Sequence, residues 1–149
     1  MKKLLMCLVC AMLVFGTFGC KKDEPVADTL GESLKAQFEV EAGKSSDVEA
    51  IANALATNEK LDFAVGAMAM EAGWLTGFNA DITGFTKCAV IMPMIGSIPF
   101  VCYIFEVDNA ETFLADIQTK ADPRWNICTE AAETVYSTKG NLVFFAMCP

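Results

Sequence analysis

Seven cysteines and the lack of any histidine define the chemistry that this 149-residue chain can offer. Cys7 and Cys10 form a CxxC motif, the spacing found in thioredoxin-like redox sites and in zinc sites. Both lie inside an apolar N-terminal run, so we expect no redox or metal site there. Cys20 ends the same segment. The other four thiols belong to the part of the chain that can fold: Cys88, Cys102, Cys128 and Cys148.

These four cysteines allow three disulfide pairings, and spacing alone selects none of them. Cys88 and Cys102 are equidistant from Ile95, so a hairpin turning there would place them opposite each other. Cys128 and Cys148 flank a second expected hairpin. Separations of 14, 26 and 20 residues provide no chelating pair for a metal. We therefore predict structural cysteines, either as disulfides or as small buried apolar side chains, and expect no metal or cofactor.

The lack of histidine excludes, within this chain, Ser-His-Asp and Cys-His catalysis and the usual zinc hydrolase sites. A reactive cysteine would need another group to stabilise its thiolate. Arg124, four residues before Cys128, is the one candidate. We find no phosphate-binding loop or dinucleotide fingerprint in the sequence. A non-catalytic protein is therefore the favoured hypothesis, and a histidine-free enzyme using Cys128 or an acidic residue is the alternative.

The first twenty residues have the organisation of a secretory signal peptide. Lys2 and Lys3 form a basic start, residues 4–15 are an uninterrupted apolar run, and Gly16 and Gly19 are small residues near its end. The run is shorter than the roughly 20 residues that a helix needs to span a bilayer. The segment therefore predicts export. Such a segment has two simple outcomes: a secreted protein cleaved near Gly16 or Gly19, or a protein that keeps the segment as an uncleaved N-terminal anchor.

The end of the segment, Gly19-Cys20, also resembles the lipobox of bacterial lipoproteins, and the resemblance covers only residues 1–20. It implies that residues 1–19 are a signal peptide and that Cys20 becomes the mature N-terminus. The same cysteine would carry acyl chains such as palmitate, and two or more chains anchor a protein stably. The resemblance thus implies a lipoprotein of the cell envelope, held on the extracytoplasmic side of a bacterial membrane.

Composition separates a tether from one folded domain and makes the mature protein acidic. Residues 20–45 are polar and mixed in charge, which is typical of a tether, with a helical stretch near residues 32–40. Residues 46–149 are predicted to form a single domain. Removal of two lysines with the signal peptide leaves 9 of the 11 basic residues beside all 19 acidic ones, so the net charge changes from −8 to −10. Nucleic acid repels such a protein, and we expect no nucleic-acid partner.

The pattern of apolar residues in the domain alternates between helices and hairpins. The order favours an α+β domain, an antiparallel sheet of about four or five strands with two helices packed mainly on one face. Because two strands are apolar on both sides, the second sheet face needs cover from the loop at residues 74–85, from the tether or from a partner. The predicted elements are a helix at 47–57, a strand at 61–70, two strands within 87–107 around a Gly96-Ser97 turn, a helix at about 109–121, and strands at 133–137 and 141–148.

Exposed aromatic and apolar side chains in loops form the candidate interaction surface. Arg124, Trp125 and Asn126 could form a small polar site with Asp122, or stack as a plain surface feature. The turn of the first hairpin is unusually apolar, and it could bind a membrane surface or a partner groove, or fold back onto the domain. We predict a membrane-anchored, non-catalytic binding or interaction module with an envelope protein or small ligand as partner. The candidate residues are Met94, Ile95, Ile98, Trp74, Arg124 and Trp125.

Overall fold

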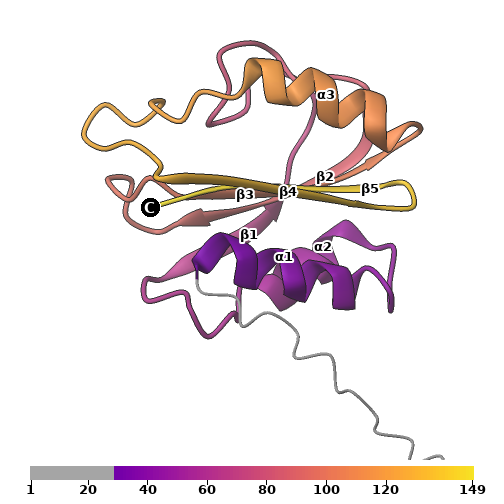
Figure 1. Ribbon diagram of the computed structural model, residues 1–149, viewed down its shortest axis with the longest axis horizontal. Helices are drawn as coiled ribbons and strands as arrows, with labels where there is room; N and C mark the ends of the chain where they lie inside the picture. Colours follow the sequence, from indigo (N-terminus) through magenta and orange to yellow (C-terminus); the bar gives the residue numbers. More distant parts are fainter. Residues whose placement is uncertain (1–28) are drawn as a thin grey trace, which may run out of the picture.

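An antiparallel sheet with helices on both faces forms the centre of the domain (Figure 1). The computed structural model describes residues 29–149; the predicted signal peptide and Cys20 lie outside the described residues. The elements are α1 (Leu30–Glu41), α2 (Val48–Leu55), β1 (Val65–Ala69), β2 (Phe85–Pro93), β3 (Val101–Val107), α3 (Ala110–Lys120), β4 (Glu133–Lys139) and β5 (Leu142–Cys148). The five strands lie in the order β1-β2-β3-β5-β4.

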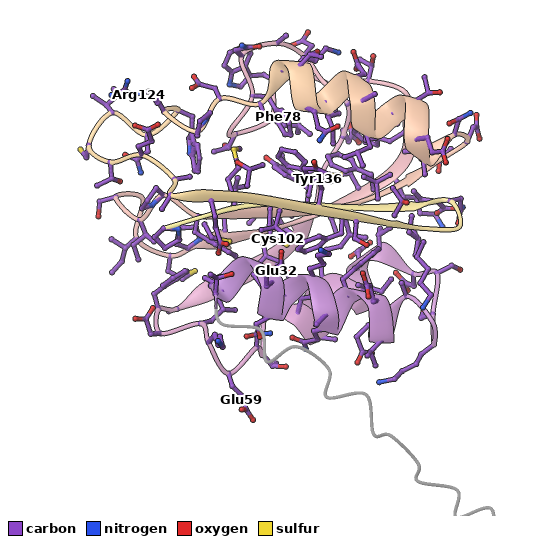
Figure 2. All side chains as sticks on the ribbon, viewed as in Figure 1. Glu32, Glu59, Phe78, Cys102, Arg124 and Tyr136 are labelled. Carbon is purple, nitrogen blue, oxygen red and sulfur yellow. The ribbon has the colours of Figure 1, made fainter. Side chains whose placement is uncertain are left out.

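The central strands β3 and β5 are apolar on both faces, so the sheet must be covered on both sides. Every residue of β5 is buried, and in β3 only Glu106 is half-buried. Successive side chains of a strand point to opposite faces. Cys102 therefore faces α1 and α2, whereas Tyr103 faces α3. Figure 2 shows side chains packed on both faces of the sheet, with Phe78 between the sheet and α3 and Cys102 on the face that α1 and α2 cover.

The helices begin where short polar side chains cap their first N–H groups. Thr29 Oγ1 accepts the Glu32 N–H at 3.2 Å, and Asn109 Oδ1 accepts the Thr112 N–H at 3.0 Å. Asp47 Oδ1 caps α2, accepting two N–H groups of its first turn. Sequence patterns therefore locate α2 and α3 to within a few residues, because these capping interactions are local.

Helix α1 belongs to the folded domain, which corrects the predicted tether. Leu34 and Phe38 are completely buried, and the Phe38 ring stacks on Phe144 with centroids 5.3 Å apart. The Gly31 N–H also donates to Glu133 Oε1 at 2.7 Å. The prediction was wrong because only two large apolar side chains, Leu34 and Phe38, are completely buried in a helix that carries many charged and polar residues. The segment between Cys20 and the described domain is thus at most residues 21–28.

The α+β class and the antiparallel sheet are confirmed, but the helices lie on both faces rather than mainly on one. Helices α1 and α2 pack on one face, while α3 packs on the other together with a loop between β1 and β2. That loop buries Leu75, Phe78 and Ile82, as one of the predicted sources of cover. Helices α1 and α2 thus cover the first face together, and α3 with the loop covers the second face.

Candidate ligand-binding cleft

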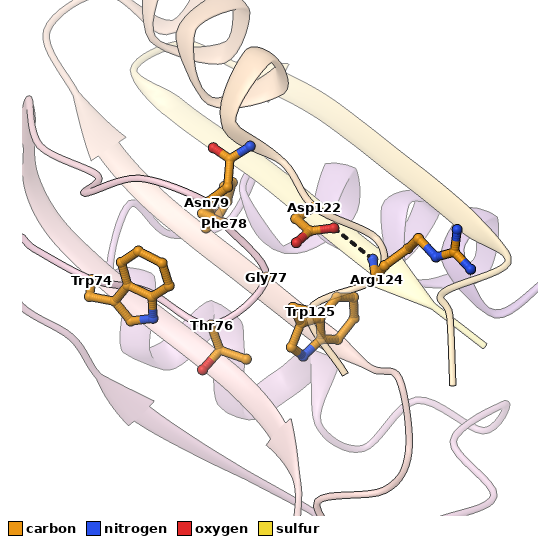
Figure 3. Close-up of a pocket in the computed structure, with 8 residues that line it drawn as sticks. All are labelled: Trp74, Thr76, Gly77, Phe78, Asn79, Asp122, Arg124 and Trp125. Atoms are coloured by element: carbon orange, nitrogen blue, oxygen red, sulfur yellow. Dashed lines mark hydrogen bonds between the residues drawn. The ribbon is translucent and has the colours of Figure 1, made fainter. Parts of the chain in front are cut away.

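A cleft of about 350 Å³ lies at the end of the sheet where β3 begins and β5 ends (Figure 3). Two loops form it, residues 74–79 after β1 and residues 122–125 after α3. A backbone hydrogen bond of 2.9 Å joins them, from the Asp122 N–H to the Gly77 carbonyl oxygen. The lining residues are Trp74, Thr76, Gly77, Phe78, Asn79, Asp122, Arg124 and Trp125.

The floor of the cleft rests directly on the sheet. Gly77 is buried with φ +89°, and a Cβ added there would lie 2.5 Å from Met147 Cε and 3.1 Å from Val101 Cγ1. Glycine permits both the left-handed conformation and this close approach. The Tyr103 hydroxyl donates to the Thr76 carbonyl oxygen at 2.8 Å. These contacts hold the loop in place, so the cleft is formed before any ligand arrives.

Both tryptophans of the chain line this cleft. Trp74 is 68% exposed, whereas Trp125 is half-buried and packs against the core on the α3 side. Figure 3 shows the two indoles on opposite sides of the cleft, with Thr76 between them. Large aromatic faces supply flat apolar contact area, and an indole also attracts cations. The predicted candidates Trp74 and Trp125 are therefore brought together, although 51 residues of sequence separate them.

The predicted polar site around Asp122 is assembled only in part. Asp122 Oδ1 accepts the backbone N–H of Arg124 at 2.9 Å, the dashed bond of Figure 3. The Arg124 side chain extends away from the two indoles, and its Nε lies 3.3 Å from a Glu130 carboxylate oxygen. The Asn126 side chain donates instead to the Gly96 carbonyl oxygen at 2.9 Å. The cleft lining therefore includes the Asp122 carboxylate, while Arg124 lies at its edge with the guanidinium turned away from the indoles and paired with Glu130.

The apolar hairpin turn adjoins this end of the sheet, and its side chains divide into two groups. Met94 and Ile95 are 73% and 62% exposed, so this part of the turn does not fold back onto the domain. Ile98 is half-buried and packs against the core beneath α1 and α2, which corrects its assignment to the surface. The turn is centred on Gly96-Ser97, so Ile98 already begins the return toward β3 and points back to the sheet.

One exposed apolar residue was missed by the sequence reasoning. Ile127 is fully exposed at 101% of its reference area. The loop that carries it is bonded to the hairpin turn, since Thr129 Oγ1 donates to the Ser97 carbonyl oxygen at 3.1 Å. In the sequence, Ile127 is a single isoleucine in a predicted connecting loop. It indicates an interaction surface only once the structure shows that this loop lies beside the hairpin turn.

The four cysteines of the domain are free thiols. Cys88 pairs with Phe105, and Cys102 pairs with Ile91, so the hairpin does not place the two cysteines opposite each other. The hairpin turns at Gly96-Ser97, as the sequence predicts, so the two thiols are not symmetric about it: they are offset by three positions and lie on opposite faces. Burial raises the pKa values of the Cys88 and Cys102 thiols.

Cys128 and Cys148, which flank the second hairpin, form no disulfide either. Cys148 is buried at the end of β5, and burial raises the pKa of its thiol as well. Cys128 is exposed in the loop before β4, where its N–H donates to Asn126 Oδ1 at 3.2 Å. Arg124, the predicted thiolate partner, is paired with Glu130 instead. Three of the four thiols thus serve as small apolar core side chains.

Residues 29–149 contain neither a metal-binding cluster of these side chains nor a membrane-spanning helix. No group of three or more histidine, cysteine, aspartate or glutamate residues in this part of the chain is arranged to hold a metal ion. In the same part of the chain, no helix has the length and apolar character needed to cross a membrane.

Comparisons with known proteins supply no relative for this chain. No protein-family model matches it, and neither the curated proteins nor the solved structures contain a significant match.

Proposed function

We propose that the protein is a lipid-anchored lipoprotein of the cell envelope whose domain is a non-catalytic binding module. The anchor is Cys20, at the end of the lipobox-like segment. The ligand site is the cleft between Trp74 and Trp125. The observation that carries the binding role is the position of both tryptophans of the chain on one preformed cleft. Ligand pockets commonly combine such apolar walls with a few polar groups, and a volume of about 350 Å³ lies at the small end of their range.

The charge of the cleft and of the chain favours a cationic ligand. Asp122 contributes a carboxylate, while Arg124 lies at the edge of the cleft, where its positive charge is offset by Glu130 at 3.3 Å. The chain carries a formal net charge of −8, which repels anions at long range. A cation between two indoles gains a further cation–π attraction. A peptide or small molecule that presents an ammonium or guanidinium group is therefore the proposed ligand class.

Intrinsic fluorescence tests this proposal directly, because every tryptophan of the chain lines the site. The mature protein is titrated with two blocked tripeptides of equal length, Gly-Lys-Gly and Gly-Glu-Gly. We expect the lysine peptide to change the emission and to bind at least about tenfold more tightly than the glutamate peptide, which corresponds to about 1.4 kcal/mol. Equal responses to both peptides, or no response to either, would contradict the proposed ligand class.

Single substitutions assign the signal to the cleft. Trp74→Phe and Trp125→Phe each leave one tryptophan as the reporter, and each should weaken binding of the lysine peptide because phenylalanine attracts cations less well than tryptophan does. Asp122→Asn should weaken binding further by removing the carboxylate charge. Tyr136→Phe is the matched control, since Tyr136 is an exposed aromatic residue on β4 outside the cleft lining. The Tyr136→Phe variant should bind the lysine peptide with the same affinity as the unmodified protein.

A further inference from the structure

Three large apolar side chains project from one end of the domain, and together we call Met94, Ile95 and Ile127 the apolar tip. Met94 is 73% exposed, Ile95 is 62% exposed, and Ile127 is fully exposed. The loop bearing Ile127 is bonded to the hairpin turn on both sides of that residue, through Asn126 and Thr129. The turn itself, residues 93–99, contains no charged side chain. Grouped exposure of this kind marks a contact surface more often than solitary exposed residues do.

Several backbone groups of the hairpin turn in the apolar tip are already hydrogen-bonded within the domain. The Met94 N–H donates to the Ala64 carbonyl oxygen at 2.8 Å, and the Ile98 N–H donates to the Ile95 carbonyl oxygen at 3.3 Å. The carbonyl oxygens of Gly96 and Ser97 accept bonds from the neighbouring loop. An unpaired polar backbone group is costly to remove from water. The tip therefore presents apolar side chains on a backbone whose transfer into an apolar environment costs less than that of a free loop.

The chain enters the domain at the same end. The Gly31 N–H bonds Glu133 at the start of β4, and Glu133 pairs with Cys148 at the end of β5. The end of β5 lies beside the start of β3, into which the hairpin turn leads. Figure 1 likewise shows the start of α1 and the two loops at one end of the sheet. Residues 21–28 reach at most about 29 Å from Cys20, so a lipid at Cys20 keeps this end near the bilayer.

We propose that the apolar tip inserts into the interfacial layer of the bilayer that holds the Cys20 acyl chains. The inference rests on the lipid anchor of the proposed function and adds a second membrane contact to it. Because the anchor already confines the domain, the tip acts at a high effective concentration and needs little affinity of its own. The contact orients the domain, and it places the tryptophan cleft, which is formed at the same end, beside the lipid headgroups.

Cys128 makes the experiment possible without adding a thiol. It is exposed and follows Ile127 directly, whereas the other three thiols of the domain are buried. The mature acylated protein is labelled at Cys128 with an environment-sensitive fluorophore and reconstituted on phosphatidylcholine vesicles, which avoid repulsion between acidic protein and anionic lipid. The control carries the label at the opposite end of β4, in a Cys128→Ser, Thr138→Cys double variant; Thr138 is exposed.

On vesicles we expect the emission of the Cys128 label to shift to the blue and most of its quenching by iodide to be lost. The label at position 138 should keep the emission and quenching that it shows in solution. The triple variant Met94→Ser, Ile95→Ser, Ile127→Ser should remain bound to vesicles through its lipid while the Cys128 label becomes fully quenchable. Circular dichroism confirms that this variant is folded, and the comparison of positions 128 and 138 is independent of it.

Three results would overturn the inference in distinguishable ways. Protein that does not sediment with vesicles refutes the anchor, and with it the tip contact that depends on the anchor. Protein that sediments but is quenched equally at positions 128 and 138 keeps the anchor and refutes insertion of the tip. Protection of the Cys128 label at the same protein concentration without vesicles shows that a second copy of the chain covers the tip instead.

Discussion

Replacing Phe38 by alanine tests whether α1 is a structural part of the domain. The Phe38 side chain is completely buried, and its ring stacks on Phe144 at a centroid distance of 5.3 Å. Truncation of a buried phenylalanine to alanine costs about 3–5 kcal/mol, because apolar area is lost and a cavity remains. Since domains of this size are stable by about 5–15 kcal/mol in total, we expect Phe38→Ala to remove a large fraction of the free energy of unfolding.

The matched control is Val40→Ala on the same helix. Val40 is 56% exposed, so its truncation should change the free energy of unfolding by no more than about 0.5 kcal/mol. Urea unfolding is followed by circular dichroism on the mature protein. With a slope of about 2 kcal/mol per M, Phe38→Ala should lower the midpoint by about 2 M and Val40→Ala by no more than about 0.25 M.

Equal midpoints for the two variants would refute the docking of α1. The tether would then extend over residues 21–45, and its maximum reach from Cys20 would rise to about 90 Å. The anchor would no longer hold the apolar tip close to the bilayer. The stability of one buried ring therefore also bears on the membrane contact.

Three further predictions follow from the packing of the sheet. Gly77→Ala should destabilise the protein by about 2–4 kcal/mol, through the strain of a left-handed backbone and through crowding of the new Cβ. Gly84→Ala, at φ +88° with open space around it, should cost only the backbone strain of about 1–2 kcal/mol, and equal losses of stability in urea unfolding would contradict the crowding at Gly77. Burial raises the pKa of the Cys88 thiol, so above about pH 8.5 the thiol loses its proton in the unfolded state but keeps it in the folded state. The free energy of unfolding should therefore fall with increasing pH, by up to about 1.4 kcal/mol per pH unit for this thiol. Urea midpoints from pH 8 to 10 should show that Cys88→Ala removes this part of the slope and that Cys128→Ser does not. Tyr103→Phe deletes the 2.8 Å hydrogen bond to the cleft wall and should cost about 1 kcal/mol, and an unchanged midpoint would mean that this bond does not hold the wall to the sheet.

Local patterns in the sequence were sufficient for most individual elements. The apolar spacing located α2 and α3, and Gly96-Ser97 marked the centre of the β2–β3 turn. The apolar residues on both faces of β3 and β5 correctly required cover on both sides of the sheet. These features depend on contacts between residues close together in the chain, where spacing and side-chain type carry the information.

Long-range contacts decided the features that local patterns missed. The short apolar stripe of α1 became a buried face only because Phe144 lies opposite Phe38. The register of β2 against β3 placed Cys88 opposite Phe105 and Cys102 opposite Ile91.

Sequence by itself determined the residue types of the candidate surface, including both tryptophans, the apolar turn and the acidic charge, and it supplied the lipobox-like segment. Only the tertiary structure decided that Trp74 and Trp125 share a cleft, that Ile98 turns inward, and that Ile127 joins the exposed side chains of the turn. The reason is physical: residue types and short spacings are properties of the chain, whereas loops meet only where sheet register and packing bring them together.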